Sequence, residues 1–140
     1  MYTLKTEAAF DSAHFLTDYY GNCENLHGHR WRVVVYIAQD HLQTSGTMKD
    51  MVLDFGAFKR EVRALADSLD HTFLVEEGSL SDATLAALRE EGFSLYMLPF
   101  RTTSENLARY FAEKLIEKSL PVSSVEMYET PHNCAIYTVE

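Results

Sequence analysis

The stretch His27-Gly28-His29-Arg30-Trp31-Arg32-Val33-Val34-Val35-Tyr36-Ile37 decides the fold of this chain. β-Branched and aromatic residues dominate it, and the odd-numbered positions from Trp31 onward are apolar, which is typical of a strand with one buried face. Residues two apart on a strand project from the same face about 6–7 Å apart, so His27 and His29 can turn toward one ion. The stretch therefore predicts a strand that begins with two metal-ligating histidines.

Four further segments carry the periodicity of secondary structure. Residues 2–10 alternate weakly and predict a first strand, antiparallel to the stretch above. From Asp54, a suitable N-cap, apolar residues recur at spacings of three and four up to Leu69 and predict a helix with one buried stripe. A capping box at residues 102–105 predicts a second long helix, and two more strands are expected over residues 124–130 and 133–139.

The order of these segments predicts the fold class. Ser81 to Gly92 predicts a short helix within an insertion between the two long helices, so the order is ββ, α, insertion, α, ββ. This is an α+β chain with helices on one face of a sheet. Its 140 residues, 46% of them hydrophobic, suit one domain that spans residues 1–140.

Composition excludes some classes of partner. A net charge of −9 opposes broad binding to nucleic acid, although it permits a small anion held locally. We see no apolar stretch typical of a signal peptide or of a membrane span, so we expect a cytoplasmic protein without membrane partners. In that compartment its two cysteines, Cys23 and Cys134, are expected to be reduced.

A metal site is the strongest chemical hypothesis. His14 ends the first predicted strand, and Cys23 lies shortly before His27 and His29. A solitary histidine is usually structural, but this clustering favours Zn²⁺, which imidazole suits. Two arrangements stay open at this point: three histidines with a vacant fourth position for catalysis, or a closed structural site in which Cys23 is the fourth ligand.

Other ionisable residues favour catalysis over a closed site. Asp70 and His71 follow the first long helix, and Glu129 lies on the predicted strand 124–130. Each alone is more typical of a helix end or a solvated strand position. Together with Cys23, however, His71 oriented by Asp70 can pass protons around a substrate that is bound to zinc.

Six short motifs in order resemble the 6-pyruvoyl-tetrahydropterin synthase family over nearly the whole chain. The chain is most similar to the bacterial branch that makes 6-carboxy-tetrahydropterin for queuosine, because three residues separate Cys23 from His27, whereas the animal branch has a longer separation. The motifs are Phe10-Asp11-Ser12-Ala13-His14, Cys23-Glu24-Asn25-Leu26-His27-Gly28-His29, Val52-Leu53-Asp54-Phe55-Gly56, Leu69-Asp70-His71, Thr103-Ser104-Glu105-Asn106-Leu107-Ala108 and Glu129-Thr130-Pro131.

The resemblance implies a role for each candidate residue. It implies that His14, His27 and His29 hold zinc. Cys23 is then the general base, and Asp70 with His71 is the second proton-transfer element. Glu129 would anchor the pterin ring by accepting hydrogen bonds from its 2-amino-4-oxo edge. Glu105, in the Ser-Glu-Asn motif, is a further expected substrate contact.

The resemblance also implies a reaction and an assembly. The implied zinc lyase converts 7,8-dihydroneopterin triphosphate to 6-carboxy-5,6,7,8-tetrahydropterin, acetaldehyde and triphosphate, without a nicotinamide cofactor. A 6-pyruvoyl product, cleavage of a related pterin side chain, and a non-catalytic zinc-stabilised pterin-binding module remain alternatives. The implied fold is the tunnelling fold, or T-fold, a four-stranded antiparallel sheet with two helices on one face. Three such sheets close a β-barrel, two trimers stack, and active sites lie at subunit interfaces.

Two departures from the family pattern fall near the substrate loop. The insertion between Ser81 and Gly92 is one, and the replacement of the usual Pro-Thr by Thr102-Thr103 is the other. The residues that hold the triphosphate stay open, with four basic candidates: Arg30, Arg32, Lys49 and Arg101.

Overall fold

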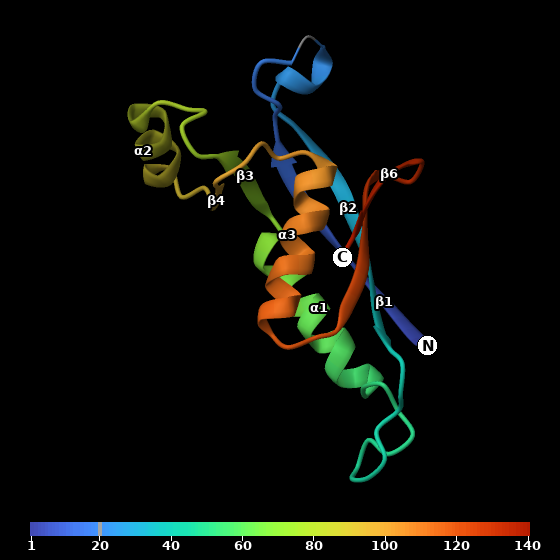
Figure 1. Ribbon diagram of the computed structural model, residues 1–140. Coiled ribbons are helices and arrows are strands. Elements are labelled where there is room, and N and C mark those ends of the chain that lie inside the picture. The colour runs from blue at the N-terminus through green and yellow to red at the C-terminus, as the bar shows by residue number, and fades with distance from the viewer. Residues whose placement is uncertain (20) are drawn as a thin grey trace.

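The structure is a computed structural model that describes residues 1–19 and 21–140. Helices α1 and α3 lie side by side across one face of a curved sheet, and α2 lies to one side beyond the short strands (Figure 1). The elements are β1 (Tyr2–His14), the 3-10 turn η1 (Asn22–Glu24), β2 (His27–Gln39), α1 (Phe55–Leu69), β3 (Thr72–Glu76), α2 (Asp82–Glu90), β4 (Leu95–Leu98), α3 (Ser104–Glu117), β5 (Val122–Thr130) and β6 (Asn133–Thr138).

The sheet has six strands in the order β4-β3-β1-β2-β5-β6. The antiparallel unit β1-β2-β5-β6 is the expected four-stranded sheet, so the predicted α+β class is confirmed. The expected number of strands was too low, because β3 and β4 extend the sheet by parallel pairing at the edge of β1. Both added strands are short, and β3 meets β1 only through Ser12 and Ala13, a long-range pairing that leaves no local pattern in the sequence.

The helix starts follow from side-chain caps. Asp54 caps α1 by accepting a hydrogen bond from the amide of Ala57 at 2.9 Å, as predicted. The predicted capping box at 102–105 was wrong by one residue, because Thr103 is the cap of α3 and accepts from the amide of Asn106 at 3.2 Å. Thr102 is instead buried beside the histidines. The short helix expected in the insertion is confirmed as α2, with Ser81 as its cap.

An aromatic stack joins the sheet to α3. The ring of Phe10 lies between Trp31 at 6.1 Å and Phe111 at 5.8 Å, measured between centroids, and all three side chains are fully buried. Burial of one such apolar side chain stabilises a fold by about 1.5–3 kcal/mol. The stack therefore fixes the position of β1 and β2 under the helices.

The register of β1 and β2 places the histidines directly beyond this stack. Phe10 pairs with Trp31, and the next pairs on the same face are Ser12 with His29 and His14 with His27. Because side chains alternate along a strand, the face that carries the aromatic core carries all three histidines at its end. The apolar core thus passes directly into a polar cluster.

The opposite face of the sheet is polar and lies away from both long helices. It carries ion pairs between Arg30 and Asp11 and between Arg32 and Glu7, each at 3.1 Å. Two edges also stay free: β6 has β5 as its one strand neighbour, and β3 covers only the end of β1, within the described residues. Among residues 1–19 and 21–140, no helix has the length and hydropathy that crossing a bilayer requires.

Candidate metal centre and active site

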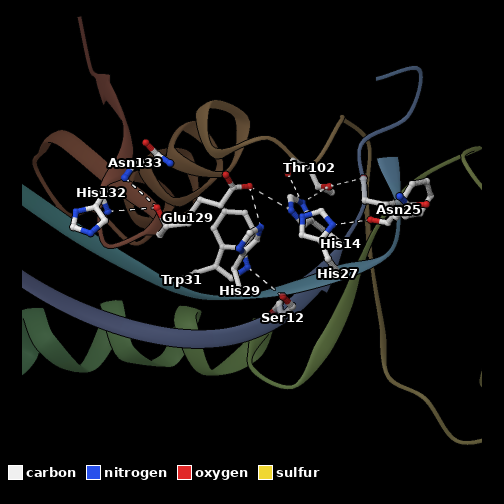
Figure 2. A network of polar contacts seen from close by, with 12 residues as sticks. Ser12, His14, Asn25, His27, His29, Trp31, Thr102, Glu129, His132 and Asn133 are labelled. Carbon is white, nitrogen blue, oxygen red and sulfur yellow. Dashed lines mark hydrogen bonds and ion pairs between the residues drawn. The ribbon is translucent and has the colours of Figure 1, made fainter. Parts of the chain in front are cut away.

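Three histidines converge at the end of the β1–β2 pair (Figure 2). Their ring centroids lie 4.6 Å apart for His14 and His27, 5.1 Å for His14 and His29, and 4.7 Å for His27 and His29. His14 is fully buried, and the other two are half-buried. The pairing of two long strands therefore brings together the three residues predicted as metal ligands.

Backbone carbonyls set the tautomers of two of these rings. Nδ1 of His14 donates to the carbonyl of Thr102 at 2.9 Å, and Nδ1 of His27 donates to the carbonyl of Asn25 at 2.6 Å. A carbonyl can only accept, so each Nδ1 carries the proton and each Nε2 presents a lone pair. This arrangement is typical of histidines that bind a metal through Nε2.

The Nε2 atoms of all three histidines are buried and have no hydrogen bond of ordinary geometry within the described residues. A buried nitrogen without a partner costs free energy unless something occupies its lone pair. A single cation among the three rings would satisfy His14, His27 and His29 at once. These unpartnered atoms are the observation that fits a metal best.

Glu129, near the end of β5, is the fourth member of the cluster. Its Oε1 lies 3.4 Å from Nε2 of His14 and 3.2 Å from Nε2 of His29, and the ligand atoms of all four residues lie within 4.8 Å of one another. Ligands of a tetrahedral zinc, each at 2.0–2.1 Å, lie about 3.4 Å apart. The separations to Glu129 therefore fit donors that share one ion.

The charges of the cluster suit a divalent cation. Burial lowers the pKa of His29, although the Glu129 carboxylate opposes that shift. The adjacent imidazole of His14 lowers the pKa of Glu129 despite partial burial of the carboxylate. The lowered pKa of His29 and the lowered pKa of Glu129 favour a neutral imidazole beside an ionised carboxylate, which are the donor forms that zinc requires.

Trp31 closes the core side of the cluster. Its ring meets those of His14 and His29 edge-on, at centroid distances of 5.0 and 5.2 Å. Its indole Nε1 donates to the carbonyl of Ser12 at 3.4 Å, which fixes the ring against β1. The candidate ligands thus pack against the fully buried ring of Trp31. Exclusion of water on that side strengthens electrostatic interactions at the site.

Cys23 stands apart from the ligand atoms. It lies half-buried in η1, on the loop that joins β1 to β2, and its carbonyl accepts from the amide of Leu16 at 2.8 Å. Among the described residues, the cluster of candidate ligands does not include its thiol. This arrangement disfavours the closed site in which Cys23 is the fourth ligand.

Asp70 and His71 form a hydrogen-bonded pair at the end of α1. Nδ1 of His71 lies 2.7 Å from one carboxylate oxygen of Asp70, and the amide of Asp11 donates to the other oxygen at 2.7 Å. The hydrogen bond from the Asp11 amide and, after it, the hydrogen bond with His71 lower the pKa of Asp70. The hydrogen bond with the Asp70 carboxylate raises the pKa of His71. The pair is therefore arranged for proton transfer.

This pair does not join the histidine cluster within one chain. His71 is 80% exposed, and its amide donates to the carbonyl of Asp11, whose side chain belongs to the opposite face of the sheet with Arg30. His71 and Arg30 line a shallow cavity of about 410 Å³ there. Neither Asp70 nor His71 belongs to the cluster of candidate ligands, although the expected ligand His29 lines the same cavity as His71.

A second cavity, of about 420 Å³, opens beside Glu129 and His29. Tyr128 and Arg32 also line it, with the guanidinium of Arg32 3.9 Å from the centre of the Tyr128 ring. A cavity with a carboxylate and an aromatic ring suits a flat heterocycle that presents hydrogen-bond donors along one edge.

The remaining predicted contacts are dispersed. Glu105 is exposed on the first turn of α3. Arg30 and Arg32 are held by the carboxylates of Asp11 and Glu7, which leaves them less free to bind a triphosphate. Lys49 lies in the loop after β2. The histidines lie at the start of this strand, and its thirteen residues extend for about 40 Å between them and that loop.

Comparison with known proteins assigns the family. The family described as 6-pyruvoyl tetrahydropterin synthase matches residues 3–140. A 6-carboxy-5,6,7,8-tetrahydropterin synthase of Haemophilus influenzae is 35% identical over 98% of this chain and 99% of its own length. One from Synechocystis is 34% identical over 82% of this chain and 97% of its own length.

Solved structures show the same fold. An uncharacterised protein of Wolinella succinogenes superposes with a TM-score of 0.81 at 24% identity, covering 99% of this chain and 98% of that one. The 6-pyruvoyl tetrahydropterin synthase of Caenorhabditis elegans gives 0.68 at 26% identity, with coverage of 99% and 96%. By sequence over almost its whole length, and by the fold of its sheet and helices, the chain belongs to the 6-pyruvoyl tetrahydropterin synthase family.

Proposed function

We propose that this chain is a zinc-dependent lyase that converts 7,8-dihydroneopterin triphosphate and water to 6-carboxy-5,6,7,8-tetrahydropterin, acetaldehyde and triphosphate, as a step toward queuosine. The observation that carries this proposal is the cluster of three buried, unpartnered Nε2 atoms beside the Glu129 carboxylate. The relatives named 6-carboxy-5,6,7,8-tetrahydropterin synthase support the choice of product, because one of them is 35% identical over nearly the full length of both chains.

The metal half of the mechanism rests on the three histidines. His14, His27 and His29 would hold zinc through Nε2, with the tautomers of two rings already set by carbonyls. A bound zinc supplies a Lewis acid that makes the hydroxyl groups of the substrate side chain more acidic. Trp31 keeps the rings oriented and excludes water from the core side.

Glu129 has two chemically distinct roles within reach. Its carboxylate can accept two hydrogen bonds from the 2-amino and N3 edge of a pterin, or it can complete the donor set around the ion. We propose the first role, because Glu129 also lines the cavity that has room for the ring. In that role the side chain orients the substrate and fixes which carbon of its side chain faces the base.

Proton movement falls to Cys23 and to the Asp70–His71 pair. Cys23 would accept the proton that the substrate side chain releases, and its place outside the ligand cluster leaves the thiol available for this. His71, whose pKa is raised by the hydrogen bond to Asp70, would hold or return a proton at Nε2.

We also propose that the chain works as a homo-oligomer, a trimer or a dimer of trimers. The free edges of β6 and of most of β1 could pair between copies and close a barrel, which would remove both edges. Such an assembly would also explain why the exposed Asp70–His71 pair lies outside the ligand cluster of its own chain. Sedimentation of a stable, fully active monomer would contradict it.

Product analysis tests the proposed reaction. Purified zinc-loaded protein incubated with 7,8-dihydroneopterin triphosphate should yield 6-carboxy-5,6,7,8-tetrahydropterin and acetaldehyde in equal amounts by mass spectrometry. Accumulation of 6-pyruvoyl-tetrahydropterin alone would overturn this product in favour of the pyruvoyl reaction. Tight binding of the pterin without turnover would instead make the chain a zinc-stabilised binding module.

A further inference from the structure

The loop that carries Cys23 meets a second loop at the metal end of the sheet. The first loop lies between β1 and β2, with residues 15–19 and 21–26 described, and the second covers residues 99–103 between β4 and α3. We propose that Arg101, in the second loop, is a positioning residue that holds the Cys23 loop in register with the metal centre. The inference rests on the proposed function, because it concerns how Cys23 is placed for that reaction.

Two hydrogen bonds join the two loops, and a third joins the two ends of the Cys23 loop. Nη2 of Arg101 donates to the carbonyl of Thr17, and the hydroxyl of Thr102 donates to the carbonyl of Phe15 at 3.4 Å. From the other side, the amide of Leu16 donates to the carbonyl of Cys23 at 2.8 Å. Residues 15–17 thus form a bridge with Arg101 on one side and the Cys23 backbone on the other.

The backbone of Arg101 is held by hydrogen bonds from the start of α3. Its carbonyl accepts hydrogen bonds from Nδ2 of Asn106 at 2.9 Å and from the amide of Thr103 at 2.8 Å. Thr103 and Asn106 are the cap pair of α3. The start of a core helix therefore fixes the backbone from which the Arg101 side chain extends.

The same loop orients a metal ligand. Thr102, the next residue, accepts the Nδ1 proton of His14 on its carbonyl, and Figure 2 shows the two side by side. One short loop thereby positions both His14 and, through Arg101 and Thr17, the segment that bears Cys23. The loop between β4 and α3 would therefore set the position of the proposed base, Cys23, relative to the metal ligand His14.

Arginine is suited to this task. A guanidinium is charged at every physiological pH, and its hydrogen bonds to carbonyls are stronger than neutral ones. A second brace is present, since the Thr17 hydroxyl donates to Glu76 at the end of β3 at 2.8 Å. Loss of Arg101 should therefore loosen the loop without unfolding the protein.

The competing role for Arg101 is a direct contact with the triphosphate. Its Nε is buried and has no hydrogen-bond partner within the described residues, so a donor remains for an anion. The two roles differ in what they predict for the thiol. A positioning residue changes the behaviour of Cys23 without any substrate, whereas a phosphate ligand changes only the binding of phosphate.

The test compares Arg101→Met, which keeps the length of the stem, with Arg101→Lys, which keeps the charge. The matched control is Arg109→Met, because Arg109 is an exposed arginine of α3 paired with Glu113 at 2.7 Å. All variants carry Cys134→Ser, so that Cys23 is the one thiol, and all are measured as zinc-loaded oligomers. The readouts are zinc content, the alkylation rate of Cys23 by iodoacetamide, and amide hydrogen exchange over residues 15–24.

We expect Arg101→Met to retain zinc while its alkylation rate and loop exchange rise by at least about tenfold, the size expected from losing one charge-assisted hydrogen bond. Arg101→Lys should restore part of the protection, and Arg109→Met should match the parent. Turnover by Arg101→Met should fall in kcat with little change in KM. Unchanged alkylation and exchange, or weakened binding of inorganic triphosphate with an unaffected thiol, would overturn the proposal.

The thiol and exchange readouts do not depend on turnover. If the parent protein fails to convert the pterin, the proposed reaction is wrong. Protection of Cys23 by Arg101 would still be measured, so the two failures are distinguishable.

Discussion

The two halves of the candidate active site are built in different ways. The metal half stands on paired strands, with His14 and His27 opposite each other, their rings oriented by carbonyls and a tryptophan behind them. The proton-transfer half comprises Cys23 on a loop and His71 on an exposed helix end. One chain thus brings the candidate metal ligands together by itself, whereas the proposed proton-transfer half depends on a loop and on surfaces that face outward.

This difference indicates how the site divides binding from chemistry. A metal needs ligands held within a few tenths of an ångström, which paired strands with locked side chains provide. Proton transfer needs access to substrate and solvent, which loops and interfaces provide. We therefore expect changes in the metal half to remove the ion together with activity, and changes in the other half to leave the ion bound.

The largest effect should come from His29→Ala. His29 is a half-buried ligand whose loss removes one donor without opening the fully buried core at His14. Zinc content measured by mass spectrometry should fall close to zero, and kcat/KM should fall by about a thousandfold or more. His132→Ala, in the exposed turn between β5 and β6, is the control and should keep both. A fully loaded His29→Ala protein would argue against the three-histidine site.

Cys23→Ala should separate the two halves most clearly. A general base contributes about 10²–10⁴ to a rate, so turnover should fall by that order while zinc content stays at the parent level. Parallel metal analysis and product formation measure both. Loss of zinc from Cys23→Ala would revive the closed structural site and would contradict the division between ligands and base.

Mixing subunits tests whether His71 of one chain serves the Cys23 and metal ligands of a neighbouring chain. Cys23→Ala and His71→Ala chains, each inactive alone, should recover up to about one quarter of the parent activity after dissociation and reassembly, by random assortment. Mixing Cys23→Ala with His29→Ala should recover much less, because both residues serve the same chain's ion. Equal recovery in the two mixtures, or none in either, would show that Cys23 and His71 of one active site do not come from different chains.

Much of the metal half could be predicted from the sequence. The alternation of residues 27–37 fixes which side chains share a face, and it therefore predicts that His27 and His29 act together. Pairing of two adjacent strands then brings in His14. In contrast, the carbonyls of Thr102 and Asn25 and the approach of Glu129 to two imidazoles arise from contacts between distant segments, and periodicity gives no sign of them.

The same reasoning explains the elements that sequence missed. Strands β3 and β4 are short and apolar, and they exist because each finds a parallel neighbour, so local pattern could not distinguish them from loop. The start of α3 shifted by one residue because Thr102 is needed beside His14, which leaves Thr103 as the cap. In both cases a long-range contact, and not the local sequence, decided the structure.

Glu129→Gln should have a smaller effect and should decide between its two roles. The amide keeps the size of the side chain but loses the charge that pairs with the pterin edge, so the substrate Kd should rise by about 10–100-fold. Zinc content should change little if Glu129 anchors the ring. A matching loss of zinc, measured on the same preparation, would place the carboxylate among the ligands instead.

The smallest effect we expect is a shift in pH dependence in Asp70→Asn. The hydrogen bond to Asp70 raises the pKa of His71, so the carboxylate favours the protonated ring. Without the negative charge that pKa should fall toward its ordinary value, and the limb of the kcat/KM profile that reports His71 should move to lower pH, whether the ring gives or takes the proton. Zinc should stay bound near neutral pH, because the pair lies outside the ligand cluster. A limb that stays in place would mean that a group other than His71 titrates there, and the Asp70–His71 pair would then have no demonstrated part in proton transfer.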